Sequence, residues 1–166
     1  MPQSIKAPAA CQPYELENFK AMLLLSEQEG EDGLDERIEQ AALLAFHYDD
    51  KRLMAISALK RANIGYLKGI FKKAGIPERD ATYPLEFGWV YTQKEYRRKG
   101  IIPILLQRLV ERSGGQAIFA VIRLSDQELA ASLKKQGFVA GGEPFFRHRQ
   151  TYKHQVYLRE APVASP

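Results

Sequence analysis

Apolar residues recur along this chain with the period of an α-helix in some segments and form short runs in others. In segment 14–28, Leu16, Phe19 and Leu23 fall three to four residues apart, which places their side chains on one face of a helix. Further helical stretches end at glycine or proline. Helices are therefore predicted at 14–28, 35–40 and 63–74, from the turn at Gly100 to the pair Gly114-Gly115, and from a cap at Ser125 or Asp126 to Gln136.

Short runs rich in β-branched and aromatic residues predict the strands. Two of them, 42–48 and 52–59, flank the turn Asp49-Asp50-Lys51 and predict a hairpin. Further strands are predicted at 85–92, 117–122, 138–146 and 153–159. Because strands and helices interleave, we expect the mixed α/β (α+β) class with a single twisted sheet.

The length of 166 residues predicts one domain, which we place at 14–160. Residues 1–13 are rich in proline, alanine and glutamine and predict a flexible N-terminal tail, with a short strand around 4–7 as an alternative there. Residues 161–166 are expected to be a frayed C-terminus.

Composition narrows the class of protein further. Hydrophobic residues make up 45% of the chain, yet no apolar run approaches the ~20 residues that a membrane-spanning helix needs. The only cysteine, Cys11, can form neither an internal disulfide nor a cysteine zinc site, and His47, His148 and His154 lack the spacing of metal ligands. We therefore expect a soluble cytoplasmic protein with no membrane contact and no metal. The net charge of +4 favours anionic partners such as a phosphorylated cofactor.

A basic loop joins the strand predicted at 85–92 to the helix that follows it. The segment Tyr96-Arg97-Arg98-Lys99-Gly100 carries three cationic side chains and ends in a glycine that permits a tight turn. The first turn of a helix leaves backbone N–H groups without partners, so a loop at this position can bind phosphate oxygens. A basic run by itself more often indicates a solvated surface, but its place between a strand and a helix favours an anion site.

In this loop, and in the order of its elements from about residue 42 to Phe138, the chain resembles the GNAT superfamily of acetyl-CoA-dependent N-acetyltransferases. The family motif is Arg or Gln, two residues, Gly, one residue, and Gly or Ala. The residues Arg97-Arg98-Lys99-Gly100-Ile101-Ile102 match it at every defined position but the last. The resemblance implies a single twisted, mostly antiparallel central sheet flanked by helices. It also implies acetyl-CoA as acetyl donor, with its pyrophosphate bound by these six residues and crowded by the branched side chain of Ile102.

The resemblance implies further contacts with the cofactor. In the family, the strand before the loop bends away from the next one, and its main chain holds the pantetheine arm. The corresponding residues here are Val90, Tyr91 and Thr92. In the helix that ends at Gln136, Asp126 stands where an asparagine often meets the pantetheine, and two further residues lie near the usual cofactor-facing positions. These two are Ser132 and Lys134.

Acetyl transfer to an amine needs a base, because an amine with a pKa of about 10.4 is almost wholly protonated at neutral pH. Glu86 lies eleven residues before Arg97, as the general base does in the histone-acetylating branch of the family. The alternative is that Glu86 faces solvent or pairs with an arginine. A backbone N–H near Val90 or Tyr91 would meet the oxyanion. The family's usual tyrosine acid is replaced by Leu133, which leaves Tyr91 or water to protonate the departing thiolate.

The sequence therefore predicts an N-acetyltransferase that moves the acetyl group of acetyl-CoA to a primary amine by direct attack in a ternary complex. The acceptor is left open between a small molecule and a peptide or protein. A homodimer is expected only by analogy with the family. A coenzyme A-binding regulatory or interaction module with weak or no catalysis is the alternative that Ile102 and Leu133 suggest. A nucleic-acid-binding protein, using the basic segment 60–79 with Lys68, Lys72 and Lys73, is a weaker alternative, because lysines of an amphipathic helix ordinarily face water.

Overall fold

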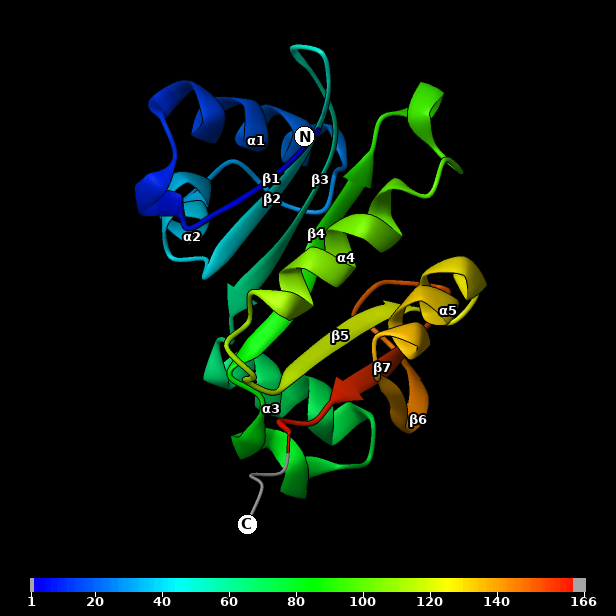
Figure 1. Ribbon diagram of the computed structural model, residues 1–166. Coiled ribbons are helices and arrows are strands. Elements are labelled where there is room, and N and C mark those ends of the chain that lie inside the picture. The colour runs from blue at the N-terminus through cyan, green and yellow to red at the C-terminus, as the bar shows by residue number, and fades with distance from the viewer. Residues whose placement is uncertain (1, 163–166) are drawn as a thin grey trace. The chain divides into compact units, whose positions relative to one another are not determined.

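Seven strands form one sheet in the computed structural model, which describes residues 2–162 (Figure 1). Their order is β1-β2-β3-β4-β5-β7-β6. Antiparallel pairs join β1 to β2, β2 to β3, β5 to β7 and β6 to β7, whereas β4 and β5 run parallel. The strands are β1 (Gln3–Lys6), β2 (Leu43–Asp49), β3 (Arg52–Arg61), β4 (Leu85–Thr92), β5 (Ile118–Arg123), β6 (Val139–Phe146) and β7 (Lys153–Arg159). The predicted class, mixed α/β with a mostly antiparallel sheet flanked by helices, is confirmed.

Each predicted helix is present, with ends that differ by a few residues from those expected. The α-helices are α1 (Pro13–Leu25), α2 (Leu34–Glu39), α3 (Ile64–Lys73), α4 (Ile101–Glu111) and α5 (Gln127–Lys135). Three short 3-10 turns were not predicted: η1 (Pro8–Ala10), η2 (Pro77–Thr82) and η3 (Lys94–Tyr96). Turns of this kind hold few hydrogen bonds and carry no apolar period, so sequence pattern does not reveal them.

The N-terminal segment differs from the flexible tail expected at 1–13. Residues Gln3–Lys6 form β1, which pairs with β2 in a register that places Ile5 opposite Ala45. The backbone hydrogen bonds of this pairing hold the segment, so the alternative of a short strand is the one that the structure bears out. Of the expected C-terminal frayed segment, residues 163–166 lie outside the described part of the chain.

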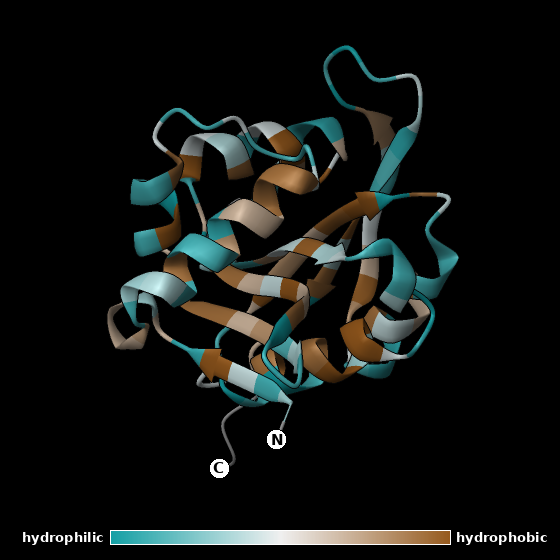
Figure 2. Cartoon of the chain, turned by 90° about the horizontal axis from the view of Figure 1, so that it is seen from above, coloured by the Kyte–Doolittle hydropathy of each residue, from teal (hydrophilic) through white to brown (hydrophobic). Residues whose placement is uncertain are grey.

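The chain divides into two compact units, and the first comprises the chain up to Lys60 together with Gly88–Arg112. Its core is formed by the apolar faces of α1 and α2 packed with residues of β2, β3 and β4, and α4 contacts β1 and β2 (Figure 1). The members of the core are Phe19, Met22, Leu23, Leu34, Ile38, Ala41, Leu44, Phe46, Leu53, Ile56, Ala58 and Trp89. In Figure 2, brown hydrophobic segments alternate with teal hydrophilic segments along the helices, as the period of the sequence predicts.

The second unit comprises Arg61–Phe87 and the chain from Ser113 onward. Here α3 packs on residues of β5, β6 and β7. The members of this core are Leu67, Ile70, Phe71, Ala74, Tyr83, Ala117, Phe119, Phe145, Val156 and Leu158. Glu86 pairs in register with Phe119 of β5, so its side chain points to the same face of the sheet as this core.

Both α3 and α5 end in the same hydrogen-bonded turn. In α5, the N–H of Phe138 bonds to the carbonyl of Leu133 and the N–H of Gly137 bonds to that of Lys134, while Gly137 has a φ of +88°. This is a Schellman motif, in which the residue after the glycine packs on the helix. Leu133 and Phe138 are accordingly 0% and 2% exposed, so the position of Leu133 serves the core.

Candidate functional site

The loop between β4 and α4 has an alternating backbone conformation. Arg98 has a φ of +64° and Gly100 a φ of +73°, whereas Lys99 and Ile101 are not among the residues with positive φ. Alternation of this kind turns successive N–H groups toward one concavity, which is the geometry that binds anions. Gly100 is also the N-cap of α4 and no side chain caps that end, so the helix presents its first N–H groups without a side-chain acceptor. The backbone of this loop is therefore suited to an anion, and the anion site itself stays a prediction.

Side chains of this loop fold back on the chain next to it. Arg97 donates from Nε to the carbonyl of Thr92 at 3.0 Å, and its guanidinium lies 5.7 Å from the ring centre of Tyr91. The ammonium of Lys99 lies 5.7 Å from the ring of Tyr96. Arg97, Arg98 and Lys99 are all exposed, so their charge reaches solvent at the mouth of the loop.

Hydrogen bonds within the first unit show to which side the N–H and C=O groups at the end of β4 point. The N–H of Gln93 bonds to the carbonyl of Met54 in β3 at 2.9 Å, so alternation turns the main-chain groups of Tyr91 toward β3. Those of Val90 and Thr92 point away from β3. The carbonyl of Val90 accepts a hydrogen bond from Nε2 of Gln28 at 2.9 Å, in agreement with this direction.

A left-handed residue interrupts β4 immediately before Val90. Trp89 has a φ of +53°, which a large side chain rarely adopts, and the conformation bends a strand as a bulge does. Its ring is held tightly, since Nε1 donates to Glu29 at 2.9 Å and the ring lies edge-on to Phe19 at 6.0 Å. The tertiary packing of this side chain thus stabilises the backbone conformation.

Ile101 and Ile102 differ in their surroundings. Ile101 is 6% exposed and belongs to the buried side of α4, whereas Ile102 is half-buried. The side chain at the position where the family has glycine or alanine is therefore partly accessible beside the first turn of α4.

In the second unit, Glu86 contacts Tyr66, which in turn contacts Arg147. Glu86 is 7% exposed and accepts a hydrogen bond from the hydroxyl of Tyr66 in α3 at 3.4 Å. That hydroxyl in turn accepts from Nη2 of Arg147, after β6, at 3.3 Å. Burial, reinforced by the charge of Glu86, raises the pKa of Tyr66 well above its usual value, so Tyr66 stays a neutral donor.

His154 lies beside this group with a second arginine. Arg123 of β5 is opposite His154 of β7 in the strand register, and its guanidinium lies 3.9 Å from the ring centre of Tyr152. His154 is 6% exposed, and its Nδ1 has no hydrogen-bond partner among the described residues. Burial, together with the positive charges of Arg147 and Arg123, lowers the pKa of His154 to about 4. The imidazole is therefore neutral at pH 7.

This lowered pKa predicts an acid sensitivity of folding. The pKa of His154 falls from the ordinary histidine value of 6.5 to about 4 in the folded chain, so the unfolded chain binds more protons between these values. The stability that the neutral imidazole contributes is complete above pH 6.5 and is lost as the pH falls toward 4. Urea denaturation at pH 7.5 and pH 4.5 measures how far the unfolding free energy drops between these values. We expect this drop to be roughly 2–3 kcal/mol smaller in His154→Phe than in the wild type. The exposed His148→Phe is the control, and an equal loss in His154→Phe and wild type would contradict the assignment.

The residues of α5 that were expected to face the cofactor have local roles. Asp126 caps α5 by accepting a hydrogen bond from the N–H of Leu129 at 3.1 Å, as the helix start predicted at Ser125 or Asp126 requires. Ser132 donates to the carbonyl of Glu128, and Lys134 is exposed. None of these contacts requires a ligand, so a cofactor role for these residues stays a prediction.

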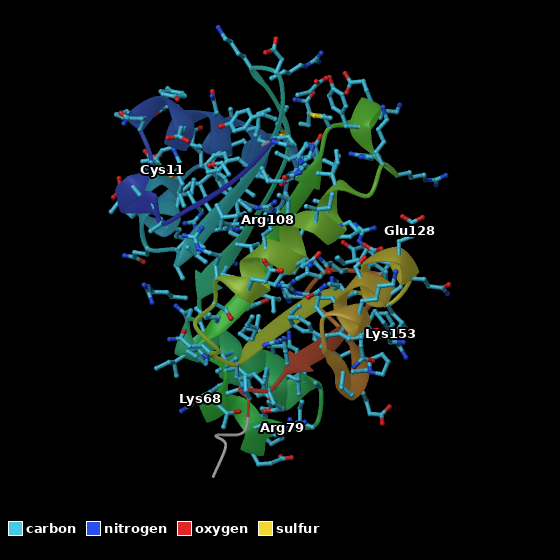
Figure 3. The ribbon with its side chains drawn as sticks, viewed as in Figure 1. Cys11, Lys68, Arg79, Arg108, Glu128 and Lys153 are labelled. Carbon is cyan, nitrogen blue, oxygen red and sulfur yellow. The ribbon has the colours of Figure 1, made fainter. Side chains whose placement is uncertain are left out.

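Other charged groups show ordinary surroundings. Lys68, labelled in Figure 3, is exposed on α3 together with Lys72 and Lys73, while the opposite face of α3 packs in the core. Among the residues whose side chains the structure describes, no group of histidine, cysteine and acidic side chains could hold a metal ion. The described helices include none that is long and apolar enough to cross a membrane.

The structure brings some of the predicted site residues together within each unit. Arg97 contacts Tyr91 and Thr92 in the first unit, which also holds the rest of the loop; Glu86, Asp126, Ser132 and Lys134 belong to the second. Sequence reasoning missed Tyr66 and Arg147. They lie 20 and 61 residues from Glu86 in the printed sequence, and a tyrosine on a helix carries no signal of its partner.

Comparison with known proteins gives the fold. No model of a protein family matches the chain, and no curated protein matches it. Among solved structures, an acyl-CoA N-acyltransferase from Pseudomonas aeruginosa is 16% identical with a TM-score of 0.67, covering 95% of this chain and 97% of its own. A GNAT superfamily phosphinothricin acetyltransferase from Sinorhizobium meliloti, in complex with acetyl-CoA, is 16% identical with a TM-score of 0.69, covering 97% and 89%. The ribosomal-protein-S18-alanine N-acetyltransferase from Escherichia coli is 10% identical with a TM-score of 0.62, covering 98% and 96%. The chain therefore has the fold of the GNAT acetyltransferases, as its resemblance implied.

Proposed function

We propose that this protein is an N-acetyltransferase that transfers the acetyl group of acetyl-CoA to a primary amine by direct attack in a ternary complex. The observation that carries the proposal is the alternating backbone of Arg98 to Ile101 at the uncapped start of α4, within a fold shared with acetyl-CoA-dependent enzymes. Solved structures of this fold include a phosphinothricin acetyltransferase and a ribosomal-protein-S18-alanine N-acetyltransferase, whose acceptors differ in kind. The fold therefore does not identify the class of acceptor, which has to be inferred from the residues of this chain.

The residues present fit acetyl-CoA, which supplies an activated acetyl thioester when bound. Main-chain N–H groups from Arg98 to Ile102 would hold the pyrophosphate, and the exposed cations of Arg98 and Lys99 would add charge. The main chain of Val90 and Thr92, which points away from β3, is suited to the pantetheine arm. The direction of alternation favours Val90 or Thr92 over Tyr91 as the donor to an oxyanion.

Glu86 is the proposed general base. It would take a proton from the acceptor ammonium, directly or through water, so that the neutral amine attacks the carbonyl carbon. The hydrogen bond from Tyr66 fixes one carboxylate oxygen of Glu86. Leu133 is fully buried and offers no acid, so water or Tyr91 protonates the thiolate, whose pKa of about 8.5 makes a strong acid unnecessary.

Two measurements test the proposal. Isothermal calorimetry with acetyl-CoA measures binding, and release of free coenzyme A in the presence of a panel of primary amines measures transfer. We expect binding, and release that depends on the amine. Absence of amine-dependent release, with or without binding, overturns the proposal.

Gly100 gives a specific prediction for binding. A Cβ at Gly100 would meet no atom within 4 Å, but the φ of +73° disfavours any other residue by about 1–2 kcal/mol. Gly100→Ala should relax this strain by moving the loop and so lower the affinity for acetyl-CoA roughly five- to thirtyfold by calorimetry. Gly30→Ala is the control, because a Cβ there also meets nothing within 4 Å and its φ is not positive. Equal affinity in Gly100→Ala and wild type would contradict a role for this backbone.

A coenzyme A-binding module without catalysis is the second candidate. The buried Leu133 in place of a polar acid favours it, as does the side chain of Ile102 beside the first turn of α4. Binding of acetyl-CoA without release of coenzyme A for any amine in the panel would support the module over the enzyme.

A further inference from the structure

Two arginines and a neutral histidine gather on the face of the second unit that α3 covers. Arg123 and His154 are opposite each other in β5 and β7, and Phe145 of β6 lies opposite His154 on its other side. Directly paired residues project to the same face of a sheet, so these side chains form a row. Arg147 follows Phe145 by two residues and reaches Tyr66 of α3.

The two guanidinium groups of this cluster have neutral hydrogen-bond partners. Within the part of the chain that the structure describes, neither Arg123 nor Arg147 lies within ion-pair distance of a carboxylate. Each instead donates to a tyrosine hydroxyl: Arg123 to Tyr152 at 3.0 Å and Arg147 to Tyr66 at 3.3 Å. Arginine forms its strongest hydrogen bonds with carboxylates or phosphates. The remaining N–H groups of these two guanidinium groups can therefore donate to an anion.

The buried histidine is a second and independent sign of a ligand. His154 is 6% exposed and its Nδ1 has no partner among the described residues, although buried polar atoms are nearly always hydrogen-bonded. An anionic ligand held by the arginines would offset the charges that keep His154 neutral and would supply an acceptor for its ring N–H. Tyr66, Tyr152 and Phe145 give the same place aromatic walls.

We propose that the acceptor is a small amine that also carries a carboxylate, which Arg147 and Arg123 bind while the amine faces Glu86. The inference rests on the proposed function and names its substrate class. Glu86 and Arg147 are each one hydrogen bond, of 3.4 and 3.3 Å, from the hydroxyl of Tyr66. A compact molecule with an ammonium and a carboxylate can bridge two groups so arranged. A protein acceptor has neutral peptide groups in its backbone, so it does not present a carboxylate of this kind to the arginines.

The test compares amines in pairs that differ only in this group: an amino acid and its carboxamide. We expect the wild type to show a kcat/KM for the carboxylate that is roughly ten- to hundredfold above that for the carboxamide, as a charge-assisted pair provides. Arg147→Gln should bring this ratio close to one, chiefly through KM, and Arg147→Lys should restore part of it. An unchanged ratio in Arg147→Gln, or a wild type that does not prefer the carboxylate, overturns the inference.

Lys153→Gln is the matched control. Lys153, labelled in Figure 3, precedes His154 in β7, so its side chain lies on the other face of the sheet, where its ammonium is 5.4 Å from the ring centre of Phe146. The substitution removes the same charge as Arg147→Gln but should leave the ratio as it is in the wild type. A fall of the ratio in both variants would indicate general electrostatics and overturn the assignment to Arg147.

A binding measurement separates the inference from the proposed function. The N-acetylated amino acid, which keeps the carboxylate and has no reactive amine, is titrated into the protein while the ring signals of His154 are followed by NMR. We expect the pKa of His154 to rise on binding, and this rise to be absent in Arg147→Gln. If no amine turns over but this response appears, the proposed transfer fails and the carboxylate site stands. If neutral amines turn over and the response is absent, the inference fails and the transfer stands.

Discussion

Glu86→Gln is expected to lower kcat/KM for acetyl transfer roughly 10²- to 10⁴-fold at pH 7.5, with acetyl-CoA affinity retained. Glutamine keeps the shape and can still accept the hydrogen bond from Tyr66, but it cannot take a proton. An amine with a pKa of about 10.4 is neutral in about one molecule per thousand at this pH, so the loss of a positioned base leaves only that small fraction to react. Stopped assays of coenzyme A release measure the rate, and calorimetry measures the binding.

The same variant predicts a change in the pH profile. As the pH rises toward 10, the neutral fraction of the amine grows and the reaction depends less on a base. The difference between wild type and Glu86→Gln should therefore shrink to about tenfold or less near pH 10. A defect that stays constant across this range would show that Glu86 acts through structure and not through proton transfer.

Glu15→Gln is a matched control for the burial of a carboxylate. Glu15 is 4% exposed and forms an ion pair with Lys6 at 3.0 Å in the first unit. Its hydrogen bonds to Gln12 and Lys6 lower its pKa despite burial, so its substitution should reduce stability. It should not produce the pH-dependent loss of kcat/KM expected for Glu86→Gln.

Local features of the chain were predicted where one short segment determines them. The strand at 85–92 was predicted with the bounds that β4 has, because its residues favour strands and Pro84 directly precedes it. The helix after Gly100 and the cap at Asp126 were predicted for the same kind of reason. The anion site was also predicted from one short segment, a basic turn between a strand and a helix, and it stays a prediction.

Features that depend on packing could not be predicted in this way. Nothing in the sequence near Trp89 indicates a φ of +53°, since the conformation is held by Glu29 and Phe19. The contact of Arg147 with Tyr66 joins residues 81 positions apart, and only the folded second unit brings them together. The substrate class that we infer comes from this contact, so it was inaccessible to pattern reasoning.

Leu133 illustrates how a departure from the family motif can have a structural reason. The position lacks the family's tyrosine acid, but it is also the residue whose carbonyl accepts the N–H of Phe138 at the end of α5. The hydrophobic contact that accompanies this motif accounts for a leucine there. This structural reason for a leucine weakens the argument that Leu133 makes for a module without catalysis.

Gly142→Ala is expected to destabilise the fold by about 3–4 kcal/mol, the largest effect on stability that we predict. Gly142 of β6 has a φ of +68°, and a Cβ there would collide with the carbonyl oxygen of Ala74 and lie 3.0 Å from the Cβ of Ala74. That carbonyl ends α3 and accepts a hydrogen bond from the N–H of Glu143 at 2.8 Å. Urea unfolding at pH 7.5, where His154 is neutral, measures the change.

Gly75→Ala separates the collision from the backbone conformation. Gly75 follows α3 with a φ of +79°, but a Cβ there meets no atom within 4 Å, so it should cost only about 1–2 kcal/mol. The excess in Gly142→Ala then measures the approach of α3 to β6. If the chain relieves the collision by moving α3, Tyr66 moves relative to Arg147, and the preference for carboxylate-bearing amines should fall along with stability. Equal effects of the two substitutions on stability would contradict the close contact between α3 and β6. If stability falls and the preference for carboxylate-bearing amines stays intact, the arrangement of Tyr66 and Arg147 does not depend on this contact.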